Sequence, residues 1–235
     1  MNAVILASGG LDSTVAAAVA RRDGYRLYLM SVDYGQRHRR ELECAAAVAK
    51  ALGAEEHRIV AVDLRAIGGS ALTDEIVVPK GRTDAQRAEG IPSTYVPARN
   101  TILLAMAIGY AERVQAQAVY IGANVVDYSG YPDCRPEFLR AMESVARLGT
   151  RAGVGGQGIA IKAPLLQLAK ADIVALGESL GVPFELTHSC YDPTAGGEAC
   201  GQCDSCLIRL EGFRVAGRID PIRYARPSRR GDHVA

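Results

Sequence analysis

The most constraining feature of this sequence is the turn Ser8-Gly9-Gly10-Leu11-Asp12-Ser13, which joins two apolar segments near the N-terminus. Residues 3–7 before it have the length of a buried strand, and the small apolar residues 14–20 after it predict a buried helix. Two glycines let the backbone approach an anion closely, and the free N–H groups of a helix's first turn attract negative charge. Strand, glycine turn and helix start together predict a phosphate-binding loop.

Neither of two common phosphate-loop patterns describes this turn. Residues 8–13 do not fit G-x-G-x-x-G, and the Walker A pattern G-x-x-x-x-G-K-[ST] occurs nowhere in the chain. On residue types alone, a tight turn with Asp12 and Ser13 capping an ordinary helix remains the alternative. The string itself is more specific, because it resembles the SGGxDS signature of the PP-loop ATP pyrophosphatases. That resemblance implies cleavage of ATP between its α- and β-phosphates, which yields AMP and pyrophosphate.

Composition narrows the classes of protein that this sequence can encode. Its 235 residues are 49% hydrophobic, which suffices for one sizeable core or a core with a small appendage. The net charge is +1, aromatic residues are few and Trp is absent, so we expect no direct nucleic-acid binding. No apolar run approaches the ~20 residues of a membrane span, and the N-terminus lacks the basic region of a signal peptide. We therefore expect a cytoplasmic protein that acts on small molecules without membrane association.

Segments of strand length alternate with segments of helical periodicity along most of the chain. After the first strand and helix, we expect strands at residues 25–32, 57–62, 117–122 and 159–163. We expect helices at residues 42–52, 100–113 and 173–180, and a further helix that ends at residue 148. This alternation predicts an α/β fold with an open, mostly parallel sheet and helices on both faces. Residues 63–93 lack such a pattern, and we expect residues 64–93 to form a lid that closes over substrate. Residues 149–158 read as a glycine-rich link.

The turn at residues 33–38 follows the second expected strand and contains Tyr34, Gln36 and Arg37. The carboxyl ends of the strands line the ligand crevice in an open parallel sheet, so we expect this turn near the nucleotide. For Arg37 and His38, spacing alone favours a solvated helix start.

A second polar loop, residues 124–137, follows the fourth expected strand and combines carboxylates, hydroxyls and aromatic rings. It could bind a flat, polar heterocycle, with Tyr128 or Tyr131 stacking on the ring and Asp133 pairing with amino groups. A tyrosine-rich surface turn is the alternative on these residues alone.

Cys190, Cys200, Cys203 and Cys206 are close together near the C-terminus, and Cys200-Gly201-Gln202-Cys203 has the spacing of a metal-binding knuckle. Four sulfur ligands suit a tetrahedral zinc ion, but C-x₂-C-x₂-C also occurs in ferredoxins, so an iron–sulfur cluster remains open. A site with four protein sulfurs has no free position, so we interpret it as structural. The other two cysteines, Cys44 and Cys134, are expected to pack in the interior.

The cysteines define a division of the chain into two parts. We expect residues 1–186 to form the nucleotide- and substrate-binding α/β domain and residues 187–235 to form a small C-terminal zinc-binding segment. Residues 214–230 carry six arginines and one acid. This tail could clamp a phosphate, a partner subunit or RNA, although a solvated end is the simpler interpretation from Arg229 onward.

These strings together resemble the 7-cyano-7-deazaguanine synthase family, and they span nearly the whole chain in order. The matching strings are Ser8 to Ser13, Asp33-Tyr34-Gly35-Gln36-Arg37-His38, Tyr95-Val96-Pro97-Ala98-Arg99-Asn100, Asp127 to Phe138, Ala163-Pro164-Leu165, Ser189-Cys190-Tyr191 and Cys200 to Cys206. The Asp127–Phe138 string and the cysteine set are far more specific than the PP-loop, which identifies only the superfamily. One departure is Ala98, where the family string has glycine; this exchange of one small residue for another puts little in doubt.

The resemblance implies a ligase that converts 7-carboxy-7-deazaguanine and ammonia to the nitrile through an acyl-adenylate and an amide. Two ATP would yield two AMP and two pyrophosphate, in the synthesis of a queuosine precursor. It also implies an adenine nucleotide alpha hydrolase-like fold, a homodimer, and Zn²⁺ on the four cysteines. We expect free ammonium as the nitrogen source, since no second domain resembles a glutaminase.

The resemblance also assigns residues to roles. ATP would contact the PP-loop through Ala7, Ser8, Gly9, Gly10, Leu11, Asp12, Ser13, Thr14, Val15, Ala16 and Ala17. Mg²⁺ would bridge the pyrophosphate with Asp12, and the catalytic groups would be Asp12, Ser13, Arg99 and Lys170. Lys162 is a further candidate charge partner. The substrate would contact Tyr34, Gln36, Arg37, Asp127, Tyr131, Asp133 and Arg135.

Two other functions compete with this interpretation. One is a different PP-loop enzyme, a tRNA thiolase that carries an iron–sulfur cluster on the same cysteines. The near-neutral charge and the lack of an added RNA-binding domain disfavour it. The other is a non-catalytic nucleic-acid-binding module built on the zinc knuckle and the basic tail, which would leave the PP-loop without a role.

Overall fold

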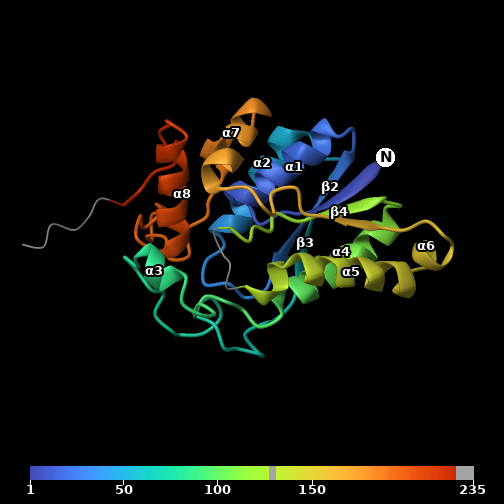
Figure 1. Cartoon of the computed structure of the whole chain (residues 1–235), viewed down its shortest axis with the longest axis horizontal. Coiled ribbons are helices and arrows are strands. Elements are labelled where there is room, and N and C mark those ends of the chain that lie inside the picture. Colours follow the sequence, from blue (N-terminus) through green and yellow to red (C-terminus); the bar gives the residue numbers. More distant parts are fainter. Residues whose placement is uncertain (127–130, 226–235) are drawn as a thin grey trace, which may run out of the picture.

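The computed structural model describes residues 1–126 and 131–225 (Figure 1). Its strands are β1 (Asn2–Leu6), β2 (Arg26–Asp33), β3 (Glu56–Ala61), β4 (Ala118–Tyr120) and β5 (Ala160–Lys162). Its α-helices are α1 (Leu11–Arg22), α2 (Arg40–Leu52), α3 (Asp84–Arg87), α4 (Arg99–Arg113), α5 (Pro136–Gly149), α6 (Arg151–Val154), α7 (Lys170–Ser179) and α8 (Asp204–Val215). Two short 3-10 helices are η1 (Pro132–Cys134) and η2 (Phe184–Leu186).

The strands of the described residues form one sheet in the order β3-β2-β1-β4-β5, and every neighbouring pair runs parallel. Figure 1 shows α1, α2 and α7 over one face of the sheet and α4 and α5 over the other. Parallel strands need crossover connections, and here the crossovers supply these two helical layers. The predicted open parallel sheet with helices on both faces is therefore confirmed.

The central strand β1 is buried on both faces, which explains its unbroken apolar sequence. Val4 and Leu6 face the core beneath α4 and α5, whereas Ala3 and Ile5 face the core beneath α1 and α2. The small side chains of α1, such as Ala16, let this helix pack on a second side against α7 and α8. Helix α1 is consequently enclosed, and the loop that precedes it is held by neighbours on several sides.

The strand order positions a ligand site. The chain runs from β1 outward through β2 to β3, and then returns to the other side of β1 with β4 and β5. The carboxyl ends of β1 and β4 therefore meet where the order reverses, and ligands bind at such switch points in open α/β sheets. Residues 8–13 leave the end of β1, so the loop lies at this position.

Three local features differ from expectation. Gly10, and neither Asp12 nor Ser13, is the N-cap of α1, and no side chain caps it; the polar pair lies inside the first turn. The glycine-rich link at residues 149–158 contains the short helix α6. Thr150 is the N-cap of this helix, and its side chain accepts a hydrogen bond from the N–H of Gly153. Helix α8 was not predicted, because its apolar residues lack a clear helical stripe.

Residues 63–93 contain only the short helix α3 among regular elements, as their pattern predicted. Closure of this segment over a substrate stays a prediction. No helix in the described residues is both long enough and apolar enough to cross a membrane.

Gly9 permits a close approach between the loop and α2. Its φ is +78°, and a Cβ atom there would lie 2.2 Å from the backbone oxygen of Glu41 and 2.7 Å from the backbone nitrogen of Ala45. Both neighbours are backbone atoms of a packed helix, so they cannot rotate away. The second residue of the SGGxDS string is therefore glycine for steric as well as conformational reasons.

Ala98 also occupies a left-handed backbone position, with φ 53° and ψ 22°, directly before α4. L-residues other than Asn and Asp rarely adopt this conformation, because their Cβ atom makes it cost roughly 1–2 kcal/mol. The glycine of the family string is thus explained by backbone geometry. The alanine is compatible with the same fold, but its left-handed conformation introduces backbone strain next to Arg99.

Substituting Gly9→Ala should lower the free energy of unfolding by about 3 kcal/mol, because backbone strain and a clash with α2 add. Gly24→Ala is the matched control: Gly24 also has a positive φ, +83°, but a Cβ there meets nothing within 4 Å. That variant should lose only about 1 kcal/mol. Urea denaturation measures both, and equal losses would contradict the steric argument.

Substituting Ala98→Gly should raise the free energy of unfolding by about 1 kcal/mol, since glycine adopts the left-handed conformation without strain. The control is Ala105→Gly at an exposed position inside the same helix. It should lower stability by about 1 kcal/mol, because glycine there only adds conformational freedom to the unfolded chain. Thermal melts of the two variants should therefore shift in opposite directions.

Candidate active site

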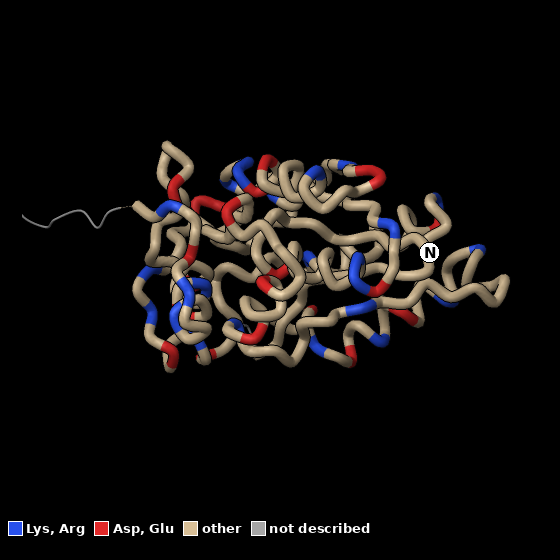
Figure 2. Tube along the Cα trace, turned by 90° about the horizontal axis from the view of Figure 1, so that it is seen from above, with Lys and Arg blue, Asp and Glu red and all other residues tan. Residues whose placement is uncertain are grey.

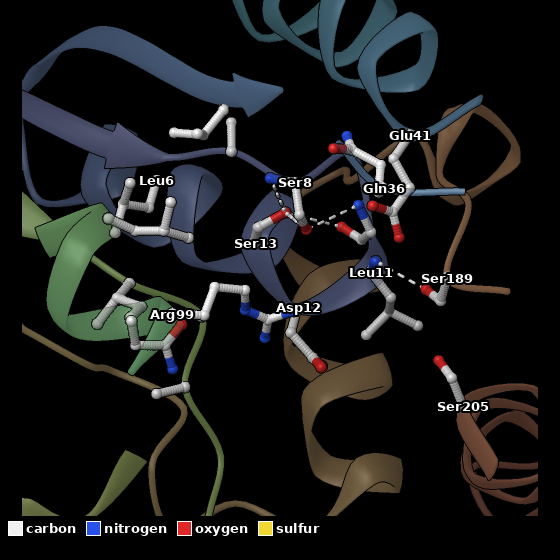
Figure 3. A pocket seen from close by; sticks show the side chains of 18 of the residues that line it. Leu6, Ser8, Leu11, Asp12, Ser13, Gln36, Glu41, Arg99, Ser189 and Ser205 are labelled. Carbon is white, nitrogen blue, oxygen red and sulfur yellow. Dashed lines mark hydrogen bonds between the residues drawn. The ribbon is translucent and has the colours of Figure 1, made fainter. Parts of the chain in front are cut away.

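A cavity of about 230 Å³ opens at the carboxyl ends of β1, β2 and β4. Its walls come from the loop after β1, the turn after β2, the start of α2 and α4, the loop after β4 and the C-terminal segment. Figure 3 shows Ser8, Asp12 and Ser13 on one wall with Arg99, Glu41 and Ser189 around them. The cavity thus brings together segments that are far apart in the sequence.

The loop residues are held by their own side chains. The Ser13 hydroxyl accepts a hydrogen bond from the Ser8 N–H at 3.2 Å, lies 3.0 Å from the Ser8 hydroxyl and donates to the Gly10 carbonyl at 3.1 Å. The N–H groups of Asp12 and Ser13 begin α1 and have no intrahelical acceptor. They are available to an anion, at the positive end of the helix dipole.

Asp12 forms an ion pair with Lys170, whose Nζ lies 2.7 Å and 2.8 Å from the two carboxylate oxygens. Lys170 is only 7% exposed and begins α7. Gly212 of α8 makes room for it, because a Cβ there would lie 2.3 Å from Lys170 Cγ. The lysine is therefore confined between two helices and directed at the loop.

The loop after β4 also contacts the first turn of α1. A Cβ atom at Gly122 would lie 2.7 Å from the backbone nitrogen of Ser13. Beyond it, the Asn124 amide donates to the carbonyls of Leu165 and Leu168, at 3.1 Å and 2.6 Å. These contacts fix the floor of the cavity and connect it to the segment before α7.

The C-terminal segment contributes a wall that sequence reasoning missed, formed by Ser189, Tyr191, Ser205 and Arg209. The Ser189 hydroxyl accepts from the Leu11 N–H at 3.3 Å (Figure 3). Arg209 is 2% exposed and lies three residues after Cys206 on the same helix. Because no apolar stripe marks α8 in the sequence, no signal there placed Arg209 at the cavity.

Arg209 is fixed by several partners. Its Nε and Nη2 donate to the two carboxylate oxygens of Asp220, at 2.7 Å and 2.9 Å. Its Nη1 donates to Thr187 at 2.8 Å and to Ser189 at 3.4 Å. A buried arginine held in this way is fixed at the cavity wall and is not free to swing, and Asp220 balances its charge.

Four of the predicted substrate residues line the cavity: Tyr34, Gln36, Arg37 and Tyr131. Arg99 lies over the Tyr34 ring, with its Cζ 5.8 Å from the ring centroid. Burial raises the pKa of Tyr34 to about 12, so the phenol stays neutral. Their assignment to the substrate stays a prediction.

Two other predicted substrate residues, Asp133 and Arg135, are not among the residues that line the cavity. Asp133 is buried, and its Oδ2 accepts from the Asn100 N–H at 2.9 Å, in the first turn of α4. Arg135 is the N-cap residue of α5 and is exposed. Asp127 lies outside the described residues.

Lys162, Arg37 and His38 make contacts that connect distant segments. Lys162 is absent from the cavity lining, and its Nζ donates to the hydroxyls of Tyr25 and Tyr120 at 3.1 Å and 3.3 Å. Arg37 donates to the carbonyl of Ile76 at 3.2 Å, and a ring nitrogen of His38 lies 3.0 Å from the carbonyl oxygen of Cys190. The expected solvated helix start at Arg37 and His38 is therefore wrong, because α2 begins only at Arg40 and both residues connect distant segments instead.

The four C-terminal cysteines are buried, and their sulfur atoms all lie within 4.8 Å of one another. Backbone N–H groups donate to the sulfurs of Cys190 and Cys200, at 3.2–3.4 Å. Such a cluster can bind a metal ion. Cys44 and Cys134 are buried elsewhere, and the predicted interior packing of both is confirmed.

Residues 80–82 attach the irregular segment to the cysteine cluster. Lys80 forms a backbone bridge with Cys203, and the Gly81 N–H donates to the carbonyl of Gln202 at 2.8 Å. Arg82 forms an ion pair with the buried Asp204 at the start of α8. The division at residue 186 stays a prediction, since the cysteine cluster packs against Ala71 and Val78 of the other part.

Comparisons with known proteins agree with this geometry. A family model described as queuosine biosynthesis protein QueC matches residues 2–217. The 7-cyano-7-deazaguanine synthase of Anaeromyxobacter sp. (strain Fw109-5) is 60% identical over 223 residues, which cover 94% of this chain and 95% of that protein. The synthase of Pseudomonas savastanoi pv. phaseolicola (strain 1448A / Race 6) is 57% identical over 223 residues, with coverages of 94% and 95%.

Solved structures share the fold at low sequence identity. NMN synthetase from Francisella tularensis has a TM-score of 0.50 and 17% identity, and the match covers 93% of this chain and 78% of that one. A 4-thiouridine synthetase in complex with RNA and ATP has a TM-score of 0.50 and 20% identity, with coverages of 95% and 47%. The family match over most of the sequence goes further than these fold likenesses, and this chain belongs to the QueC family of queuosine biosynthesis proteins.

Proposed function

We propose that this chain is an ATP-dependent carbon–nitrogen ligase that converts 7-carboxy-7-deazaguanine and ammonia to 7-cyano-7-deazaguanine. The single observation that carries the proposal is the shared cavity: the free N–H groups of the PP-loop open into the same space as Tyr34, Gln36 and Tyr131. A nucleotide and a flat heterocycle can therefore meet there. The names of its relatives, at 57–60% identity, support this substrate.

The first step is adenylation of the carboxylate. A carboxylate is a poor electrophile, and transfer of AMP from ATP turns one of its oxygens into a leaving group. The protein must hold two anions together and stabilise the charge that develops on the α-phosphate. We assign the phosphates to the loop residues from Gly9 to Ser13 and the positive charge to Lys170 and Arg99. Arg209 joins this set because it lies on the same cavity.

The second half of the reaction forms the nitrile. Ammonia displaces AMP and gives the amide; the amide oxygen then attacks a second ATP, and loss of a second AMP leaves the nitrile. The overall reaction consumes two ATP and releases two AMP and two pyrophosphate. One cavity serves both halves, because the same oxygen-activating chemistry occurs twice.

We assign the heterocycle to the part of the cavity lined by Tyr34, Gln36, Arg37 and Tyr131. The two tyrosines provide aromatic surface, and the Gln36 amide and Arg37 provide donors. We retain Asp127 as a proposed pairing group from the family string. Asp133 and Arg135 are assigned to shaping the loop, because their contacts are with the starts of α4 and α5.

Asp12 would hold a Mg²⁺ ion together with phosphate oxygens, which is the usual arrangement at nucleotide sites. Its carboxylate fits this role because it lies in the loop and its side chain is 24% exposed toward the cavity. When bound, the ion neutralises charge on the leaving pyrophosphate. Lys170, already paired with Asp12, would keep this carboxylate oriented.

The cysteine cluster fits Zn²⁺. A tetrahedral ion with Zn–S bonds of about 2.3 Å separates its ligands by about 3.8 Å, and the sulfurs of Cys200 and Cys206 are 3.9 Å apart. An iron–sulfur cluster would place several atoms between its ligands and require a wider spacing. Bound zinc would contribute folding energy to the C-terminal segment.

We further propose that the enzyme is a homodimer, acts in the cytoplasm and uses free ammonium. Direct nucleic-acid binding is not part of the proposal. Figure 2 shows basic and acidic positions interspersed along the chain, which agrees with a net charge of +1. Nucleic-acid surfaces normally concentrate basic residues on one face.

Mixing the purified protein with 7-carboxy-7-deazaguanine, ATP, Mg²⁺ and ammonium should give the nitrile with two AMP per product, measured by mass spectrometry and nucleotide chromatography. Replacing ammonium with glutamine should reduce the yield to background. Lys170→Met should lower kcat/KM by about 100-fold, through lost charge stabilisation. AMP without nitrile would retain the PP-loop chemistry but reject the proposed substrate.

Metal analysis should find about one zinc per chain. Cys203→Ser should abolish stoichiometric zinc and lower the free energy of unfolding by several kcal/mol, because metal binding contributes to folding. Cys44→Ser is the control, since Cys44 lies on α2 outside the cluster and this variant should keep its zinc. Stoichiometric iron with absorbance near 400 nm would instead support the tRNA thiolase interpretation.

A further inference from the structure

Glu41 is a carboxylate of the cavity that none of the roles above uses. It is the second residue of α2, it is half-buried, and it lines the cavity with the loop residues. Figure 3 shows its side chain beside Gln36, on the side of the loop where Ser189 lies. No hydrogen bond or ion pair joins its carboxylate to another of the described residues. Its backbone oxygen is the atom that would clash with a Cβ at position 9, so only glycine fits there.

This position is unfavourable for a carboxylate with only a structural role. A negative charge beside a phosphate-binding loop repels the nucleotide, and a half-buried charge loses hydration without gaining a partner. The rigid contact between α2 and Gly9 nevertheless holds Glu41 there. By contrast, Glu43 on the same helix is exposed and paired with Arg40 at 2.9 Å. Glu41 therefore has the placement of a group that acts on a ligand.

Burial raises the pKa of Glu41 to about 7, against the opposing effect of the Arg99 charge. The titratable groups that face it are Tyr34 after β2, Arg99 on α4 and Cys44 one turn further along α2. The same cavity also holds the Asp12–Lys170 pair, Arg37, His38, Tyr131, Tyr191 and Arg209. A carboxyl group that titrates near neutral pH can accept and release protons during turnover.

The proposed reaction requires such a group, because nitrogen loses protons in both halves. Attack of ammonia on the acyl-adenylate gives a positively charged nitrogen, which must lose one proton as AMP departs. The amide then carries two N–H protons. After its oxygen is adenylated, both protons must leave the nitrogen before the carbon–nitrogen triple bond is complete and the second AMP is released.

We propose that Glu41 is the general base that accepts these nitrogen protons. This inference rests on the proposed function. In the first half, the Glu41 carboxylate takes one proton from the attacking nitrogen while the carbon–oxygen bond to AMP breaks, and it releases this proton to water before the second half begins. In the second half it takes one proton from the adenylated amide, releases it to water, and takes the other as the second carbon–oxygen bond breaks. AMP leaves with the bonding electron pair each time.

The test separates the adenylation steps from the nitrogen steps. Glu41→Gln keeps the size of the side chain but cannot accept a proton, and Glu43→Gln is the matched control on the same helix. Single-turnover release of pyrophosphate from acid and ATP without ammonium measures adenylation. Amide formed from acid and ammonium, and nitrile formed from supplied amide, measure the two nitrogen steps.

For Glu41→Gln, we expect adenylation within about threefold of the unmodified enzyme and a loss of about 100-fold in both nitrogen steps. Nitrile formation by the unmodified enzyme should rise with pH through about 7, since the base must be ionised. This rise should be absent from the residual activity of Glu41→Gln. Glu41→Asp should recover part of the rate, and Glu43→Gln should match the unmodified enzyme throughout.

Other outcomes would overturn the inference. Nitrogen steps that are unaffected in Glu41→Gln would show that the carboxylate is not the base. Adenylation that falls equally, with a higher Mg²⁺ requirement, would identify a metal ligand instead. If the unmodified enzyme makes no nitrile from either the acid or the supplied amide, the proposed function itself is wrong. This outcome is distinct from a defect seen only in Glu41→Gln.

Stability distinguishes lost chemistry from lost folding. A carboxyl group whose pKa is higher in the folded state stabilises the fold at low pH, and this contribution disappears as pH rises through about 7. At pH 8, Glu41→Gln should therefore melt at the same temperature as the unmodified enzyme or higher. A lower melting temperature with equal losses in every step would assign Glu41 a structural role.

Discussion

The packing of α2 against Gly9 is the contact on which the site depends. It presses a helix backbone onto the loop at a distance that only glycine allows, and it does so at the point where the strand order reverses. Gly122 imposes a second close contact, from β4 onto the first turn of α1. Two neighbours thus hold the free N–H groups in place, which is the preorganisation that charge stabilisation requires.

Much of the fold and of the loop was predictable from sequence, because both depend on local patterns. The strand-length run at residues 3–7 and the helical spacing of Leu104, Ala107 and Ile108 determine which faces are buried. The glycine pair determines a backbone conformation. These patterns depend only on neighbouring residues, so they can be recognised in one sequence without information on distant contacts.

The rest of the site could not be predicted, because it depends on tertiary contacts between distant segments. Arg209 and Ser189 reach the loop only because α8 packs on α7, with Lys170 passing the small Gly212. Lys162 looked equivalent to Lys170 in sequence, but its strand directs it toward Tyr25 and Tyr120. The roles of Ala98 and Asp133 likewise follow from backbone geometry at the start of α4.

The cysteine cluster therefore affects more than the stability of a tail. Cys203 and Cys206 begin α8, and the same helix carries Ser205 and Arg209 into the cavity. Cys190 adjoins Ser189, whose hydroxyl meets the first N–H of α1. An ion that holds the four sulfurs would fix both connections at once. The cysteine cluster and the phosphate loop are thus joined by direct contacts, although none of the four cysteines is among the residues that line the cavity.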